Sequence, residues 1–189
     1  MITATSSLRD VVATIANALA ARGICVVVVG ASAITAHAHR VHTPQTIDFA
    51  VPSGMQPEAI EETLRALGFT RNGRRYASGA SPFDIEFVGE MPRIRNHTVT
   101  EYETIETSSG PFQTLRIEDA VADRIAAYLY AHDSHSLHLA ERTLEQLNVQ
   151  IDRWELKKLI DSFDVHGDRA ATRRLTYLRE RLWLGKPQT

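Results

Sequence analysis

The sequence predicts an α/β fold of the α+β kind, in which a sheet flanked by helices is followed by a C-terminal helical bundle. Residues 24–29 form a continuous apolar run rich in β-branched side chains, which is typical of a strand covered on both faces. Residues 46–51 and 83–88 alternate polar and apolar side chains, as half-buried strands do. After residue 117 the apolar residues recur at helical spacing instead.

The first half of the chain contains two predicted helices with recognisable ends. Ser6 or Ser7 is the expected N-cap of the first helix, because a serine hydroxyl can accept a hydrogen bond from a free backbone N–H. Gly23 ends that helix, since glycine readily adopts the left-handed conformation that follows a helix. Pro57 begins the second helix and Gly68 closes it in the same manner.

Two further segments predict β-hairpins. Residues 69–78 surround Asn72-Gly73, a dipeptide that favours a tight turn between antiparallel strands. Residues 99–105 and 112–117 are separated by a turn of serine, glycine and proline, and we expect them to form a hairpin or two edge strands.

The C-terminal part carries four apolar stripes at helical spacing. The change of pattern near residue 117 predicts an α/β domain of residues 1–117 and a helical domain of residues 118–189. The stripes consist of Val121, Ile125, Tyr128 and Leu129; Leu137, Ala140, Leu144 and Leu147; Leu156, Leu159, Ile160 and Phe163; and Ala171, Leu175, Leu178 and Leu182.

Composition limits the classes of function. The chain has 189 residues, 43% of them hydrophobic and 23% charged, which is ordinary for a soluble globular protein. Its formal net charge of −2 gives no overall field that would attract nucleic acid. The longest apolar run is far shorter than the roughly 20 residues of a membrane-spanning helix, so we expect a cytoplasmic protein without a membrane partner. Cys25 is the only cysteine, which excludes an internal disulfide, and its apolar neighbours predict a buried thiol.

A candidate site combines a glycine turn with one aspartate. Gly30 follows the first predicted strand at once, and Ala31 and Ser32 keep the next residues small. Such a turn at the start of a helix leaves backbone N–H groups free to bind an anion such as phosphate. Asp48 alternates with apolar residues on the next strand, so its carboxylate shares a face with small neighbours.

Two more carboxylates, Asp84 and Glu86, share one face of the third predicted strand. Arginines supply the opposite charge: Arg74 and Arg75 lie in the predicted hairpin and Arg40 lies after the glycine turn, where each could contact phosphates. Histidines 37, 39 and 42 and histidines 132, 135 and 138 form two groups, but neither includes an acid or cysteine at a zinc-like spacing.

The stretches Gly30-Ala31-Ser32 and Thr46-Ile47-Asp48-Phe49-Ala50-Val51 resemble the signature of the nucleotidyltransferase superfamily of DNA polymerase beta type. They are most similar to the small bacterial, toxin-like members, and the resemblance covers residues 24–90. It implies a mixed sheet. Two departures stand out: Ala50 occupies the position of the second acid, and the segment between the turn and Asp48 is longer by a few residues.

The resemblance implies a reaction and roles for residues. A nucleoside triphosphate would donate its nucleoside monophosphate to a hydroxyl of a small molecule, a protein or an RNA, with Mg²⁺ or Mn²⁺ as the metal. Asp48 and Glu86 would be the metal ligands, and Glu86 or Asp84 would activate the attacking hydroxyl. Gly30, Ala31 and Ser32 would bind the triphosphate.

Ala50 keeps alternative interpretations open, because it removes one carboxylate from the implied metal site. The chain could be a catalytically degenerate member that acts as a nucleotide- or protein-binding module, as a homodimer or in a toxin and antitoxin pair. Asp48 could instead cap a turn or pair with an arginine, and Gly30 could serve only the turn. Asp84, Glu86 and the hairpin arginines could be solvated surface residues. The helical part could also dominate, as an assembly scaffold.

Overall fold

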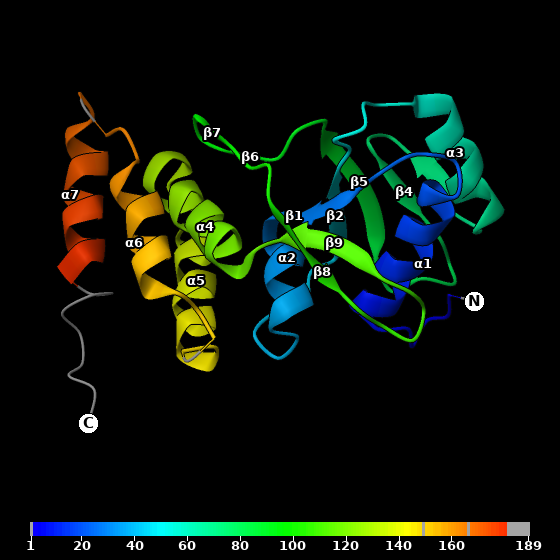
Figure 1. Ribbon diagram of the computed structural model, residues 1–189, viewed down its shortest axis with the longest axis horizontal. Helices are drawn as coiled ribbons and strands as arrows, with labels where there is room; N and C mark the ends of the chain where they lie inside the picture. The colour runs from blue at the N-terminus through cyan, green and yellow to red at the C-terminus, as the bar shows by residue number, and fades with distance from the viewer. Residues whose placement is uncertain (1, 149, 166, 181–189) are drawn as a thin grey trace.

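The computed structural model describes residues 2–148, 150–165 and 167–180, and its centre is a seven-stranded mixed sheet (Figure 1). The strand order is β3-β4-β5-β2-β1-β9-β8, and β6 and β7 form a separate two-stranded ribbon. The strands are β1 (Val27–Val29), β2 (Thr46–Ala50), β3 (Thr70–Asn72), β4 (Arg75–Ala77), β5 (Asp84–Gly89), β6 (Arg93–Ile94), β7 (His97–Thr98), β8 (Tyr102–Ile105) and β9 (Phe112–Leu115).

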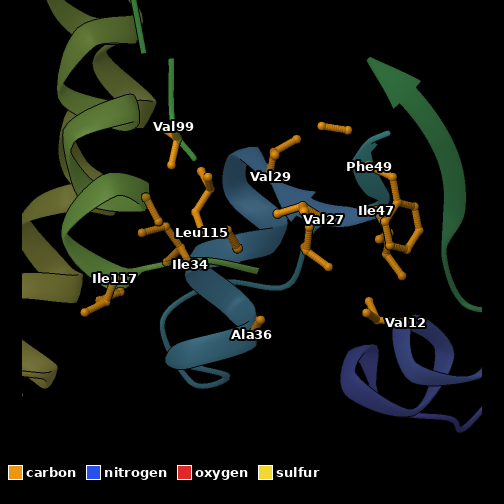
Figure 2. Packing of buried hydrophobic residues seen from close by; sticks show 14 of the residues in the cluster. Val12, Val27, Val29, Ile34, Ala36, Ile47, Phe49, Val99, Leu115 and Ile117 are labelled. Atoms are coloured by element: carbon orange, nitrogen blue, oxygen red, sulfur yellow. The ribbon is translucent and has the colours of Figure 1, made fainter. Parts of the chain in front are cut away.

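The two helices predicted in the first half of the chain are confirmed, and they pack against each other. Helix α1 (Leu8–Ala20) has Ser7 as its N-cap, and α3 (Pro57–Ala66) begins with Pro57. Figure 2 shows Ile47 and Phe49 of β2 on the side that faces Val12 of α1, and all three are fully buried. The alternation of β2 therefore buries one of its faces against α1 and leaves Asp48 on the other.

The first strand is shorter than its apolar run. Val27 pairs with β2 on one side and with β9 on the other, so both ladders begin there. Cys25 precedes the ladders and is exposed between the buried Ile24 and Val26, so the predicted buried thiol is wrong. Hydrophobic neighbours in the sequence did not bury it, because this alternating segment turns its side chain outward.

Both predicted hairpins are confirmed. The β3–β4 hairpin pairs Asn72 with Arg75 across the turn at Gly73, whose φ is +62°. The β8–β9 hairpin is also present, but β9 lies between β1 and β8 and runs parallel to β1. Strand β9 is therefore an interior strand, and β8 is the edge strand. The β6–β7 ribbon was not predicted, since its two-residue strands carry no periodic pattern.

The predicted C-terminal helices form a bundle in which α4 (Ile117–Ala131) is central (Figure 1). Helix α4 packs on α2 (Gly30–His37) and on α5 (Ser134–Gln146), α6 (Arg153–Asp161) and α7 (Arg169–Arg179). The three later helices begin at an aspartate N-cap that accepts hydrogen bonds from the first turn. Leu182 of the fourth stripe lies outside the described residues.

A single hydrophobic cluster includes buried residues of both parts of the chain, and Figure 2 shows Ile34 of α2 near Leu115 at the end of β9 and Ile117 at the start of α4. The division into domains at residue 117 stays a prediction. Within the described residues, no helix is both long and apolar enough to cross a membrane.

Candidate functional site

Strand register brings Asp48 between the glycine turn and the acidic strand. Asp48 pairs with Val29, the last residue of β1, and on its other side with Glu86 of β5. Directly paired residues of neighbouring strands project from the same face of the sheet. The carboxylates of Asp48 and Glu86 are therefore neighbours. Asp48 lies opposite Val29, the residue directly before Gly30.

Gly30 is essential to this geometry for two reasons. Its φ of +65° belongs to the left-handed region, which side chains other than glycine rarely adopt. A Cβ atom at this position would lie 3.0 Å from Oδ2 of Asp48. The absence of a side chain at Gly30 thus leaves space next to the Asp48 carboxylate. Helix α2 begins at this point, and its N-cap, Val29, has no side chain that could accept hydrogen bonds from the first N–H groups of the helix.

The two residues after Gly30 have different surroundings. Ser32 is fully buried, and its hydroxyl donates to the carbonyl of Thr46 over 2.9 Å and accepts from the N–H of Asp48 over 3.4 Å. The hydroxyl thus fastens β2 to the start of α2. Ala31 is half-buried on the first turn of that helix. Both residues can reach an anion only through their backbone N–H groups.

Burial and a like charge raise the pKa of Asp48. Its pKa increases from 3.8 to about 6, mainly because the carboxylate is desolvated and next because Glu86 lies beside it. Arg124 and Arg75 oppose the shift, and Asp123 adds to it. A carboxylate in this state gains by binding a cation, and carboxylate oxygens are ligands that Mg²⁺ prefers. Asp48 and Glu86 therefore fit a divalent metal ion.

Glu86 is paired with the hairpin arginines. Its Oε2 lies 3.3 Å from Nε of Arg75 and its Oε1 lies 3.4 Å from Nη2 of Arg74. The Glu86 side chain is 15% exposed, against 86% for Arg74 and 50% for Arg75. The structure thus brings the predicted residues Arg74, Arg75 and Glu86 together, with both arginines paired to the glutamate.

The same-face neighbours of Asp48 on β2 are Thr46 and Ala50, and neither carries a carboxylate. Ala50 is almost fully buried opposite Val27, farther from the turn, whereas Thr46 pairs with Asp84 on the side where α2 begins. The strand β2 therefore supplies one carboxylate, and Asp84 lies on β5 beside Thr46.

Arg124 of α4 was missed by the sequence reasoning. Its Nη2 lies 3.9 Å from the Cβ position of Gly30, and its charge lowers the pKa of Asp48. Asp123 and Ser136 bind its guanidinium, through Nε to Oδ2 of Asp123 over 3.2 Å and through Nη1 to the Ser136 hydroxyl over 3.4 Å. An Asp-Arg pair on an amphipathic helix looks like an ordinary solvated face, so no local pattern could have identified it.

Other predicted residues are not brought to this place. Arg40 is exposed and follows the C-terminal end of α2, the end opposite Gly30. His42 contacts His135 of α5 with 5.5 Å between ring centres, and burial is the main cause that lowers the pKa of His42. Among the described residues, no group of three or more histidines, cysteines and acids is arranged to hold a metal. A metal here would thus require oxygens of its substrate or water as additional ligands.

Comparison with known proteins supports the fold. The solution structure of the antibiotic-resistance factor ANT(2'')-Ia is similar with a TM-score of 0.51 at 16% identity, over 95% of this chain and 98% of that one. A crystal structure of ANT(2'')-Ia in complex with adenylyl-2''-tobramycin gives 0.50 at 15%, over 90% and 99%. An antigenic nucleotidyltransferase-like protein from Paracoccidioides brasiliensis gives 0.50 at 11%, over 93% and 95%.

The predicted nucleotidyltransferase-like fold, with a mixed sheet flanked by helices, is confirmed by these likenesses. At such low identity they concern the fold and not the reaction. No protein-family model matches the chain, and no curated protein sequence does.

Proposed function

We propose that this protein is a nucleotidyltransferase, which transfers a nucleoside monophosphate from a nucleoside triphosphate to a hydroxyl of a small molecule. One observation carries the proposal: the half-buried carboxylate of Asp48 lies against Gly30 at the open start of α2, beside Glu86. A triphosphate at the N–H groups of this turn would lie within reach of a metal on Asp48.

The residues present account for the parts of such a reaction. Mg²⁺ or Mn²⁺, when bound, would neutralise charge on the phosphate oxygens, and Asp48 and Glu86 would hold it. The acceptor oxygen forms a bond to the α-phosphorus while the bond to the pyrophosphate oxygen breaks. Asp84, which pairs with Thr46 near the turn, or Glu86 would take the proton that leaves the acceptor hydroxyl.

A small-molecule acceptor is favoured over RNA or protein. The related fold of ANT(2'')-Ia has been captured with adenylyl-2''-tobramycin, and this chain matches nearly its whole length. The overall charge of −2 also lacks the attraction for RNA that a basic protein would have.

A second candidate function, nucleotide or protein binding without catalysis, is supported by the state of Glu86. Two arginines neutralise this carboxylate, and β2 offers one carboxylate where the resemblance leads us to expect two. A site with a neutralised glutamate and one carboxylate fewer is what we expect of a catalytically degenerate member that acts as a homodimer or in a toxin and antitoxin pair.

Thermal unfolding with ATP, CTP, GTP or UTP, each with Mg²⁺ or Mn²⁺, tests whether a nucleotide binds. A ligand present at 100 times its dissociation constant stabilises the folded state by about 2.7 kcal/mol. We expect one nucleotide to raise the midpoint in the wild type and not in Asp48→Asn. Glu106→Gln is a matched control, since Glu106 is an exposed acid on the β8–β9 loop.

Release of pyrophosphate in the presence of hydroxylated acceptors separates the two candidates. A metal-dependent release that Asp48→Asn abolishes supports the transferase. Nucleotide binding without any release, with all acceptors tried, supports the binding module. If no nucleotide shifts the midpoint, the transferase proposal fails.

A further inference from the structure

Arg124 and Asp48 face the same space above Gly30, although they come from distant parts of the chain. A Cβ atom on Gly30 would lie 3.0 Å from Oδ2 of Asp48 and 3.9 Å from Nη2 of Arg124. The space that a side chain would fill is thus lined by both a carboxylate and a guanidinium. Helix α2 also begins here, with N–H groups that its N-cap side chain leaves unbound.

The guanidinium of Arg124 is held in place by two helices. Asp123 accepts from both Nε and Nη2, and the Ser136 hydroxyl of α5 accepts from Nη1. Ser136 in turn donates to Asp133 over 2.7 Å, and Asp133 caps the start of α5. The Arg124 side chain is only 19% exposed. A guanidinium fixed in this way loses little conformational entropy when it binds an anion.

These contacts do not use the whole guanidinium. Arginine has five N–H donors in a planar fork, and the three bonds above occupy three of them within the described part of the chain. N–H groups on both terminal nitrogens therefore remain, and Nη2 is the nitrogen nearest Gly30. Arginine binds phosphate through pairs of such N–H groups.

We propose that Arg124 binds the triphosphate of the substrate above Gly30, in the same space that the metal held by Asp48 would share. This inference rests on the proposed function, and it names polyphosphate as the chemical group that the α4 side of the site recognises. It assigns the triphosphate to Arg124 instead of Arg40, which lies at the other end of α2.

The role also makes the helical segment part of the site. Arg124 and its partners belong to α4 and α5, whereas Gly30 and Asp48 belong to the sheet and α2. Close packing of α4 on α2 is what brings the two together.

Calorimetric titration of the full chain with inorganic tripolyphosphate and with nucleoside triphosphate plus Mg²⁺ tests the proposal. We expect Arg124→Gln to weaken both ligands at least tenfold, and Arg124→Lys, which keeps the charge, to recover part of the loss. Ser136→Ala, which removes one of the two partners of the guanidinium and leaves Asp123 in place, should weaken binding by a few-fold. Arg65→Gln is the control, since Arg65 is an exposed arginine that pairs with Glu61 on α3.

Each outcome decides one question. If the wild type binds nucleotide and Arg124→Gln binds it equally well, the role of Arg124 is refuted and the transferase proposal stands. If tripolyphosphate binds through Arg124 but no acceptor is modified, the role of Arg124 stands and the transferase proposal fails. If Arg124→Gln unfolds, Arg124→Lys and Ser136→Ala decide: unchanged affinity in both refutes the role. If the folded wild type binds neither ligand, both proposals are overturned.

Discussion

Arginines approach the neighbouring carboxylates of Asp48 and Glu86 from two directions, the α4 side and the hairpin side, and the two sides differ in how firmly their arginines are held. On the α4 side, Arg124 is largely buried and is bound by Asp123 and by Ser136 of a second helix. On the hairpin side, Arg74 and Arg75 belong to the short β3–β4 hairpin and are exposed. Their nitrogens lie 3.4 and 3.3 Å from the carboxylate oxygens of Glu86.

The two sides are therefore suited to different tasks. A buried guanidinium with fixed partners is already in position to bind a ligand. Exposed arginines hold Glu86 weakly, because surface ion pairs contribute only about 0 to 1 kcal/mol. They can therefore release the carboxylate when a metal competes for it.

Filling the space between the two sides should have the largest effect. Gly30→Ala places a Cβ at φ +65° and 3.0 Å from Asp48, so we expect backbone strain of roughly 1 to 2 kcal/mol and loss of the nucleotide-induced shift. Gly73→Ala is the matched control, because its φ is +62° and nothing lies within 4 Å. Urea unfolding and thermal shift measure both. Equal nucleotide binding in the two variants would contradict the proposal that the nucleotide binds in the space above Gly30.

Removing the negative charge of Asp48 should stabilise the protein at neutral pH. The pKa of Asp48 is 3.8 in its ordinary state and about 6 when folded, so the folded state binds more protons between these values. The free energy of unfolding therefore falls as pH rises from about 4 to 6. We expect Asp48→Asn to be more stable by about 1 to 2 kcal/mol at pH 7.5 and no more stable near pH 4.

Urea unfolding of Asp48→Asn and wild type at the two pH values measures this difference. A variant that is less stable than the wild type at pH 7.5 would show that the ionised carboxylate stabilises the fold by itself, in conflict with the raised pKa.

The pKa of Asp48 should report how strongly each side acts on it. Arg124 lowers this pKa more than Arg75 does, and Glu86 raises it. We expect Arg124→Gln to raise the pKa further than Arg75→Gln, and Glu86→Gln to lower it. Carboxyl ¹³C NMR across pH measures all three. A larger rise in Arg75→Gln would reverse the order of the two sides.

The smallest effect is expected at the most exposed arginine. Arg74→Gln should change the free energy of unfolding by less than about 0.5 kcal/mol, because its ion pair with Glu86 is in contact with solvent. Urea unfolding at low and high salt measures it. A loss above 1 kcal/mol would mean that the hairpin side is as firmly built as the α4 side.

Much of the fold was predictable because its signals are local. The caps of α1 and α3, the hairpin turn at Gly73 and the alternation of β2 each depend on neighbours in the sequence. The pairing of β9 with β1 was not predictable, because it joins strands more than 80 residues apart and no local pattern encodes it. Cys25 shows the same limit, since its exposure depends on where the ladder begins.

For the candidate site, the chemical groups could be read from the sequence: a glycine followed by small residues, one aspartate on a strand, and two acids sharing a face of another strand. Which of these groups meet depends on the folded chain. Strand register put Glu86 beside Asp48 and against two arginines, and the packing of α4 on α2 added Arg124. Alternation and capping act over a few residues, whereas strand register and helix packing depend on the burial of side chains from the whole chain.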